Sequence, residues 1–142
     1  MTYRTFIFKN YLFDPATKKL DLQYGYDDTL DFHEVYTFDF DYADYQPAAL
    51  DQALQGLFFM AGVSYYKTYM APEILIKKGG PDKTSAEFFD ETYQKGLGEF
   101  FYTNNLDPRT PVNFPATTGT GQTAHFKAGD GLLVGLGGGK DS

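Results

Sequence analysis

Residues 5–40, TFIFKNYLFDPATKKLDLQYGYDDTLDFHEVYTFDF, decide the fold of this chain. Apolar and aromatic side chains alternate with polar ones in three successive runs, which is the period of half-buried strands. The segments Asp14-Pro15-Ala16-Thr17 and Asp27-Asp28-Thr29 separate the runs, and Asp and Pro favour tight reversals. We therefore predict an antiparallel β meander. Its apolar parity consists of Phe6, Phe8 and Leu12, then Leu20, Leu22, Tyr24 and Tyr26, then Phe32, Tyr36, Phe38 and Phe40.

A helical period replaces the alternation after Pro47, a residue that suits the first turn of a helix. Gly62 falls inside the pattern and costs about 1 kcal/mol relative to Ala in a helix interior, so we expect a bend or a close contact there. The pattern predicts a first main helix that packs on the sheet. Its apolar positions are Leu50, Leu54, Leu57, Phe58, Ala61 and Tyr65.

A short strand and a second main helix follow. The apolar run Ile74-Leu75-Ile76 is typical of a strand. Thr84 and Glu87 have the spacing of a capping box, which predicts a helix that runs from there to about Asn104. Its apolar stripe consists of Phe89, Tyr93, Leu97 and Phe100 or Phe101, with Gly96 and Gly98 inside the pattern.

The last third of the chain has a different composition. Residues 107–121 are rich in Pro, Thr and Gly, and the prolines exclude a continuous helix. Leu132-Leu133-Val134 is a continuous apolar run, as in a strand buried on both faces of a parallel sheet. We predict an α+β fold in which the meander packs with two main helices over residues 1–106. A loop or linker spans 107–130, and residues 131–142 form the first strand and phosphate loop of a truncated α/β nucleotide domain.

Composition excludes several classes of protein. Twelve Lys and Arg stand against nineteen Asp and Glu, which argues against a nucleic-acid-binding surface. The sequence has no cysteine, so it holds no disulfide, thiolate metal site or cysteine nucleophile. No secretory pattern follows Met1, and no apolar run approaches the ~20 residues that span a bilayer. We expect a cytoplasmic protein that binds neither nucleic acid nor membrane.

The sequence ends in Gly137-Gly138-Gly139-Lys140-Asp141-Ser142. Consecutive glycines after a buried strand expose backbone N–H groups that can wrap an oxyanion closely. A Walker A loop would need Gly in place of Val134, and Ser or Thr after Lys140. A Gly-x-Gly-x-x-Gly fingerprint that starts at Gly135 would need Gly at position 140. Both patterns fail, which leaves a phosphate loop of another kind.

The segment VGLGGGKDS, residues 134–142, resembles the pyrophosphate loop of ATP pyrophosphatases. The first loop position is usually Ser in that superfamily and is Gly137 here. Two upstream segments narrow the resemblance, GVSYYK at residues 62–67 and GLGEFFYTNN at residues 96–105. With them, the whole chain is similar to the N-terminal domain, first strand and loop of the UDP-N-acetylmuramoyl-L-alanyl-L-glutamate epimerase family of peptidoglycan synthesis.

The resemblance implies ATP and Mg²⁺ as cofactors and a UDP-MurNAc-dipeptide as substrate. ATP would activate the terminal L-Glu of UDP-MurNAc-L-Ala-L-Glu as an acyl-adenylate and release diphosphate. Removal and return of the acidified α-proton, followed by hydrolysis, would give D-Glu and AMP. In this reading Gly137–Gly139 donate backbone N–H groups to the phosphates and Ser142 donates its hydroxyl. Lys140 adds positive charge, and Asp141 orients the loop or approaches Mg²⁺.

Five residues of the upstream segments are candidates for the substrate site. Tyr65, Tyr66, Lys67 and Asn104 are the predicted substrate-binding residues. Glu99 follows a glycine and precedes two phenylalanines, where a partly buried carboxylate with a raised pKa would serve as a proton-transfer base. The alternative for the tyrosines is a core aromatic pair, with a lysine that extends along the surface. The alternative for Glu99 is an exposed or capping role.

The remaining histidines and acidic residues give no metal signature. His33 lies on the less aromatic parity of its strand and His125 in a polar loop, so both are interpreted as surface imidazoles. Asp39, Asp41 and Asp44 lack the Gly and distal Glu of a calcium loop, which favours a solvated acidic turn.

Two further functions stay open beside the epimerase. One is a different adenylating enzyme of the pyrophosphatase superfamily, such as an amide synthetase, and the other is a non-enzymatic binding or assembly domain. A phosphate loop needs the helix that follows it, because the helix N-terminus helps to hold the anion. We therefore expect this chain alone neither to turn over substrate nor to bind ATP tightly, and to depend on the remainder of a parent chain beyond Ser142.

Overall fold

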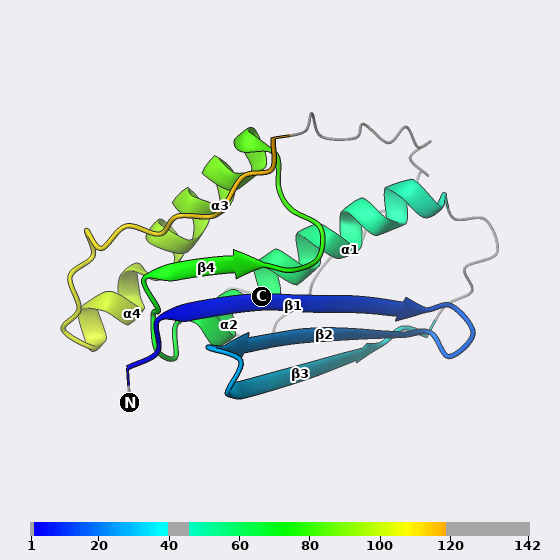
Figure 1. Cartoon of the computed structure of the whole chain (residues 1–142), viewed down its shortest axis with the longest axis horizontal. Helices are drawn as coiled ribbons and strands as arrows, with labels where there is room; N and C mark the ends of the chain where they lie inside the picture. The colour runs from blue at the N-terminus through cyan, green and yellow to red at the C-terminus, as the bar shows by residue number, and fades with distance from the viewer. Residues whose placement is uncertain (1, 40–45, 119–142) are drawn as a thin grey trace, which may run out of the picture.

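Four strands form one mixed sheet in the computed structural model, which describes residues 2–39 and 46–118 (Figure 1). The strands are β1 Thr5–Asp14, β2 Lys19–Tyr26, β3 Leu30–Thr37 and β4 Glu73–Ile76, in the order β3-β2-β1-β4. β2 pairs antiparallel with β1 and with β3, which confirms the predicted meander. β4 confirms the predicted short strand but pairs parallel with β1, so the sheet as a whole is mixed.

Aspartates shape both turns of the meander. The Asp14 carboxylate accepts from the Ala16 backbone at 2.9 Å and from the Thr17 hydroxyl at 2.7 Å. Asp27 and Asp28 have positive φ angles of 48° and 53°, a conformation that aspartate tolerates better than most residues. The Asp27 carboxylate also accepts from the backbone N–H of Thr5 at 2.7 Å. The second turn therefore fixes the start of β1 as well as its own reversal.

One side chain of β1 faces the opposite way from the prediction. The β1–β2 register is shifted between Phe8 and Asn10, so that Lys9 occupies a bulge. A bulge inserts one residue and reverses the parity of everything that follows it. Leu12 was expected on the core face, but it is 50% exposed, while Tyr11 is 3% exposed and lies in the core.

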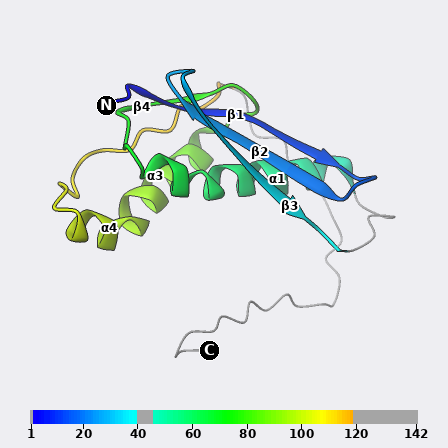
Figure 2. The same ribbon diagram turned by 90° about the horizontal axis from the view of Figure 1, so that it is seen from below.

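Helices cover one face of the sheet (Figures 1 and 2). The first predicted helix consists of α1 Pro47–Ala61 and α2 Val63–Tyr66, and the second of α3 Lys83–Gly96 and α4 Gly98–Thr103. Pro47 occupies the first turn as expected. The capping prediction for Thr84 and Glu87 is wrong, because Asp82 is the N-cap and accepts from the Ser85 backbone N–H at 2.8 Å. No described helix is long and apolar enough to cross a membrane.

Gly62 breaks the first helix at a point of close approach. A Cβ atom there would lie 2.9 Å from Cζ of Phe8 and 3.1 Å from the Tyr93 hydroxyl, although the φ of Gly62 is an ordinary helical −55°. The expected close contact is therefore confirmed. It brings the α1–α2 junction against both the sheet and α3.

Three buried tyrosine hydroxyls bond to carbonyl oxygens beside this break. Tyr24 donates to the carbonyl of Phe58 at 2.8 Å, and Tyr93 donates to that of Phe59. Tyr26 donates to the carbonyl of Tyr66 at 2.6 Å. The Phe58 and Tyr66 carbonyls also accept backbone N–H groups, from Gly62 at 3.2 Å and from Met70 at 2.9 Å. A carbonyl oxygen has two lone pairs, so the hydroxyls add second hydrogen bonds there and tie the sheet and α3 to the α1–α2 segment.

Residues 107–118 contain no helix or strand, as their prolines predicted. They nevertheless pack on the domain, because Val112 and Phe114 are each only 6% exposed and belong to the core. The Asp90 carboxylate of α3 accepts from the Phe114 backbone N–H at 2.6 Å. Burial raises the pKa of Asp90 even though this hydrogen bond favours the ionised form.

The close approach at Gly62 predicts opposite effects for two glycines of the same helical segment. Gly62→Ala should lower the free energy of unfolding by about 1–3 kcal/mol, because the new methyl group overpacks against Phe8. Gly56→Ala should raise it by about 0.5–1 kcal/mol, because nothing lies within 4 Å of the added atom. Urea denaturation followed by circular dichroism measures both. Equal effects at the two positions would contradict the packing described here.

The buried tyrosine hydroxyls predict that two Tyr→Phe variants will differ in their effect on stability. Tyr93→Phe keeps the ring but leaves the Phe59 carbonyl unpaired in the core, which should cost about 1–3 kcal/mol of stability. Tyr102→Phe should change stability by less than about 0.5 kcal/mol, because Tyr102 is 85% exposed. The same denaturation experiment applies. A stability loss in the second variant and none in the first would refute the role assigned to the hydroxyl.

Candidate functional site

The predicted site residues fall into two groups. Gly137–Ser142 and residues 132–134, which were predicted to form a strand, lie outside the described residues, as do His125, Asp41 and Asp44. Tyr65, Tyr66, Lys67, Glu99 and Asn104 lie within them, on or beside the short helices α2 and α4. The structure therefore shows where the side chains of the second group lie.

Tyr66 belongs to the core. It is 2% exposed, and its ring centroid lies 5.7 Å from that of Phe6 and 5.5 Å from that of Tyr93. Burial raises the pKa of its hydroxyl. Tyr65 is half-buried and stacks on Tyr24 at 4.9 Å. The alternative interpretation, in which the two tyrosines form a core aromatic pair, therefore holds for Tyr66 and holds only in part for the half-buried Tyr65.

Lys67 and Asn104 meet at Phe100. The Lys67 ammonium lies 5.9 Å from the centroid of the Phe100 ring, which is cation–π range. The Asn104 side-chain amide donates to the Phe100 carbonyl at 2.9 Å and so caps the end of α4. Asn104 is exposed and Lys67 half-buried. The structure thus brings two predicted substrate-binding residues together from separate helices and leaves both accessible.

Glu99 does not have the environment on which its predicted role was based. It lies in the first turn of α4 and is exposed. An exposed carboxylate there interacts favourably with the positive end of a helix, so the premise of partial burial is wrong and the alternative of an exposed side chain holds. Its function as a proton-transfer base stays a prediction without support from burial.

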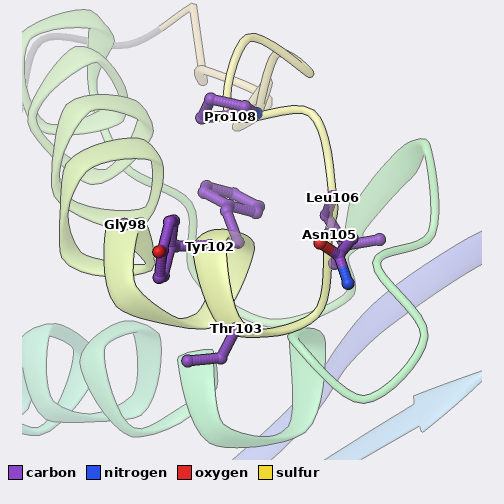
Figure 3. Close-up of a pocket in the computed structure, with 7 residues that line it drawn as sticks. Gly98, Tyr102, Thr103, Asn105, Leu106 and Pro108 are labelled. Carbon is purple, nitrogen blue, oxygen red and sulfur yellow. The ribbon is translucent and has the colours of Figure 1, made fainter.

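A pocket of about 630 Å³ opens beside α4 (Figure 3). Tyr102 projects from α4, and Asn105 follows in a left-handed conformation with φ 53°, which turns the chain toward Pro108. The lining carries ring, aliphatic, hydroxyl and amide groups but no ionisable acid, imidazole or amine. Such a surface suits the binding of a flat or amphipathic ligand better than acid–base chemistry. The lining residues are Gly98, Phe101, Tyr102, Thr103, Asn105, Leu106 and Pro108.

Within residues 2–39 and 46–118, no group of three His, Asp or Glu side chains is arranged to hold a metal ion. His33 is exposed, as expected, and its Nδ1 lies 3.4 Å from an Asp21 carboxylate oxygen. The structure therefore assigns no metal ligand in this part of the chain.

A polar cluster on β3 escaped the sequence interpretation. Glu34 lies on the helix-facing side of the strand, where Tyr36 donates a hydrogen bond to its carboxylate at 2.6 Å. The ring of Tyr65 lies 5.0 Å from that of Phe32, which shares this side of β3, and burial and the nearby Glu34 carboxylate both raise the pKa of Tyr65. A signal was available, because Glu34 interrupts the aromatic parity that Phe32 and Tyr36 share.

These observations define the class as an α+β domain with helices on one face of a four-stranded mixed sheet. Its accessible features are an uncharged pocket and two polar clusters beside aromatic rings. The chain belongs to the MurL N-terminal domain family, whose model matches residues 1–142.

Two relatives illustrate the similarity. A UDP-N-acetyl-alpha-D-muramoyl-L-alanyl-L-glutamate epimerase of Xanthomonas oryzae pv. oryzae is 41% identical over 66% of this chain and 21% of its own length. A protein of the same name from Salinispora tropica is 33% identical over 96% of this chain and 32% of its own length. The chain thus spans about a third or less of the relatives it matches. No solved structure matches it.

The placement of the candidate residues predicts which of them support the fold. Tyr66→Ala should lower the free energy of unfolding by about 3–5 kcal/mol, because it empties a large core site. Asn104→Ala should cost no more than about 1 kcal/mol, because it removes one exposed cap. Thermal and urea unfolding measure both. Comparable losses in the two variants would show that Asn104 is structural and not available for a ligand.

Proposed function

We propose that this chain is the N-terminal domain of an epimerase that converts the terminal L-Glu of UDP-MurNAc-L-Ala-L-Glu to D-Glu in peptidoglycan precursor synthesis. The observation that carries the proposal is the match of the family model to all of residues 1–142. The relatives that align with 96% of the chain bear the name of that epimerase, which supports the same activity for the protein that contains this domain. A nucleotide-linked substrate favours a cytoplasmic location.

The proposed chemistry uses ATP as a second substrate. Attack of the glutamate carboxylate on the α-phosphate forms an acyl-adenylate and releases diphosphate. This mixed anhydride makes the α-proton more acidic, a base removes it, and a proton returns from the opposite face. Water then cleaves the mixed anhydride and yields AMP with the D-Glu product. This route rests on the glycine-rich sequence of residues 137–142.

We assign substrate binding and phosphate binding to different parts of this chain. Lys67 and Asn104 would contact the substrate, since both are accessible and both contact Phe100 of α4. Gly137–Gly139 and Ser142 would hold the phosphates, and Asp141 would bind Mg²⁺. The described residues offer no carboxylate cluster for the metal, so Asp141 is proposed on its sequence position alone.

An adenylating enzyme with another acceptor is the competing proposal, because the glycine-rich loop alone would serve any such enzyme. An assembly domain without catalysis is the third, and the uncharged lining of the pocket is compatible with it. The shared name of the relatives favours the epimerase over both.

A chimera tests the proposal. Residues 1–142 would replace the matching N-terminal third of the Salinispora tropica relative, and the product would be incubated with UDP-MurNAc-L-Ala-L-Glu, ATP and Mg²⁺. We expect D-Glu after acid hydrolysis, resolved by chiral chromatography, together with AMP and diphosphate. Diphosphate release that does not need the dipeptide would favour another adenylating enzyme. A folded chimera that neither epimerises nor releases diphosphate, beside an active parent, would refute the proposal.

Two variants of the chimera separate the loop from the rest of the domain. Asp141→Asn should lower diphosphate release at least about tenfold, because one charged contact to the phosphates or Mg²⁺ is lost. Glu91→Gln should leave the rate unchanged, because Glu91 is an exposed side chain of α3 that pairs only with Lys95. If Asp141→Asn retains the full rate, Asp141 has no part in ATP use.

A further inference from the structure

Glu34 is the only charged residue on the helix-facing side of the four described strands. The cross-strand pairs Leu20–Tyr36, Leu22–Glu34 and Tyr24–Phe32 establish which residues share that side. Every other position on it is apolar or aromatic, from Phe6 in β1 to Ile76 in β4. A carboxylate in such a row loses solvation without a gain in packing, so its position needs an explanation.

Aromatic groups surround the Glu34 carboxylate. The Tyr36 hydroxyl donates to one carboxylate oxygen at 2.6 Å, and this bond, with burial, raises the pKa of Tyr36 to about 12. The ring of Tyr65 lies 5.0 Å from that of Phe32, beside the same carboxylate. Within the described residues, no lysine, arginine or histidine forms an ion pair with Glu34. The Glu34 carboxylate is therefore a hydrogen-bond acceptor between aromatic rings, and no cationic side chain in the described part of the chain neutralises it.

The cluster is accessible from solvent. The helix-facing residues of β2, Leu20 to Tyr26, are fully buried, whereas those of β3, Leu30 to Tyr36, are half-buried. The helix layer thus covers β2 and thins out over β3, which is the edge strand of the sheet in Figures 1 and 2. A carboxylate has about four acceptor sites, and the hydroxyls of Tyr36 and Tyr65 are the described groups that approach it. Two donors leave acceptor capacity for the hydroxyl groups of a ligand.

We propose that Glu34, Tyr36 and Tyr65 form a subsite that binds the hydroxyl groups of a sugar ring. The carboxylate accepts from hydroxyl donors, the phenol groups of Tyr36 and Tyr65 add polar contacts, and the faces of Phe32 and Tyr65 pack against the apolar side of the ring. This rests on the proposed function, whose substrate carries hydroxyl-bearing sugars and no cationic group.

The test compares two ligands that differ only by the sugar. The 142-residue chain, isotope-labelled, is titrated with UDP-MurNAc and with UDP, and affinities are taken from chemical-shift changes. We expect UDP-MurNAc to bind at least tenfold more tightly than UDP. Glu34→Gln and Tyr36→Phe should remove most of that difference and leave UDP binding unchanged. Tyr36→Phe deletes only a hydroxyl, so it stays informative if Glu34→Gln fails to fold. Glu91→Gln is the control for a lost surface carboxylate.

Three other outcomes would contradict the proposed subsite. Equal affinity of the wild-type chain for UDP-MurNAc and UDP shows that no sugar is recognised. Unchanged affinities in both variants, with new aggregation of Glu34→Gln, assign Glu34 to protection of the edge strand, a known use of inward-pointing charges. Preference for an organic cation over the sugar nucleotide would identify a cation site instead.

The epimerase chimera keeps this proposal distinct from the proposed function. Epimerisation with an unchanged KM in the Glu34→Gln chimera removes the subsite and leaves the function in place. Sugar-dependent binding without epimerisation supports the subsite and counts against the function.

Discussion

The described structure depends on a helix that breaks inside an aromatic core. The break at Gly62 lets the α1–α2 segment touch Phe8, and three carbonyl oxygens of that segment lie within hydrogen-bond reach of tyrosine hydroxyls. Tyr24, Tyr26 and Tyr93 donate to those oxygens from the sheet on one side and from α3 on the other. Burial raises the pKa of all three hydroxyls, so they remain neutral donors well above neutral pH. Phenylalanine would fill the same space but remove these hydrogen bonds, at about 0.5–1.5 kcal/mol for each carbonyl that keeps a backbone partner, as those of Phe58 and Tyr66 do.

The three consecutive side chains at the end of α2 point in different directions. Tyr65 stacks on the sheet beside Glu34, Tyr66 enters the core, and Lys67 extends over Phe100 on α4. One helical turn therefore links the β3 cluster, the core and the α4 surface. Gly62 permits the close approach to Phe8 at the junction of α1 and α2, where a side chain would not fit. The constraint that stabilises the fold thus also positions both candidate binding regions.

Sequence periodicity predicted the elements well and their details less well. Alternation located the three meander strands, and helical spacing located both main helices, because these patterns follow directly from which side chains are buried. The bulge at Lys9 was not predictable in this way, since one inserted residue leaves the composition unchanged and reverses the parity of Leu12. Asp82 was missed because two plausible caps lay close together. Glu34 was visible as a break in an aromatic row, but its hydrogen-bond partners depend on the fold.

The net charge of the chain limits how the anionic nucleotide sugar of the proposed function would bind to this domain. The chain carries a net charge of −7, so long-range attraction does not favour such a ligand. Contacts would then come from neutral polar groups and ring faces, as in the α4 pocket, from a local cation, as at Lys67, and from ligand hydroxyls that donate to the Glu34 carboxylate. Backbone N–H groups are the remaining source of phosphate contacts, and they need no charged side chain. Under the proposed function, this acidic domain would therefore bind the sugar and peptide parts of the ligand, and the glycine-rich sequence would bind the phosphates of ATP.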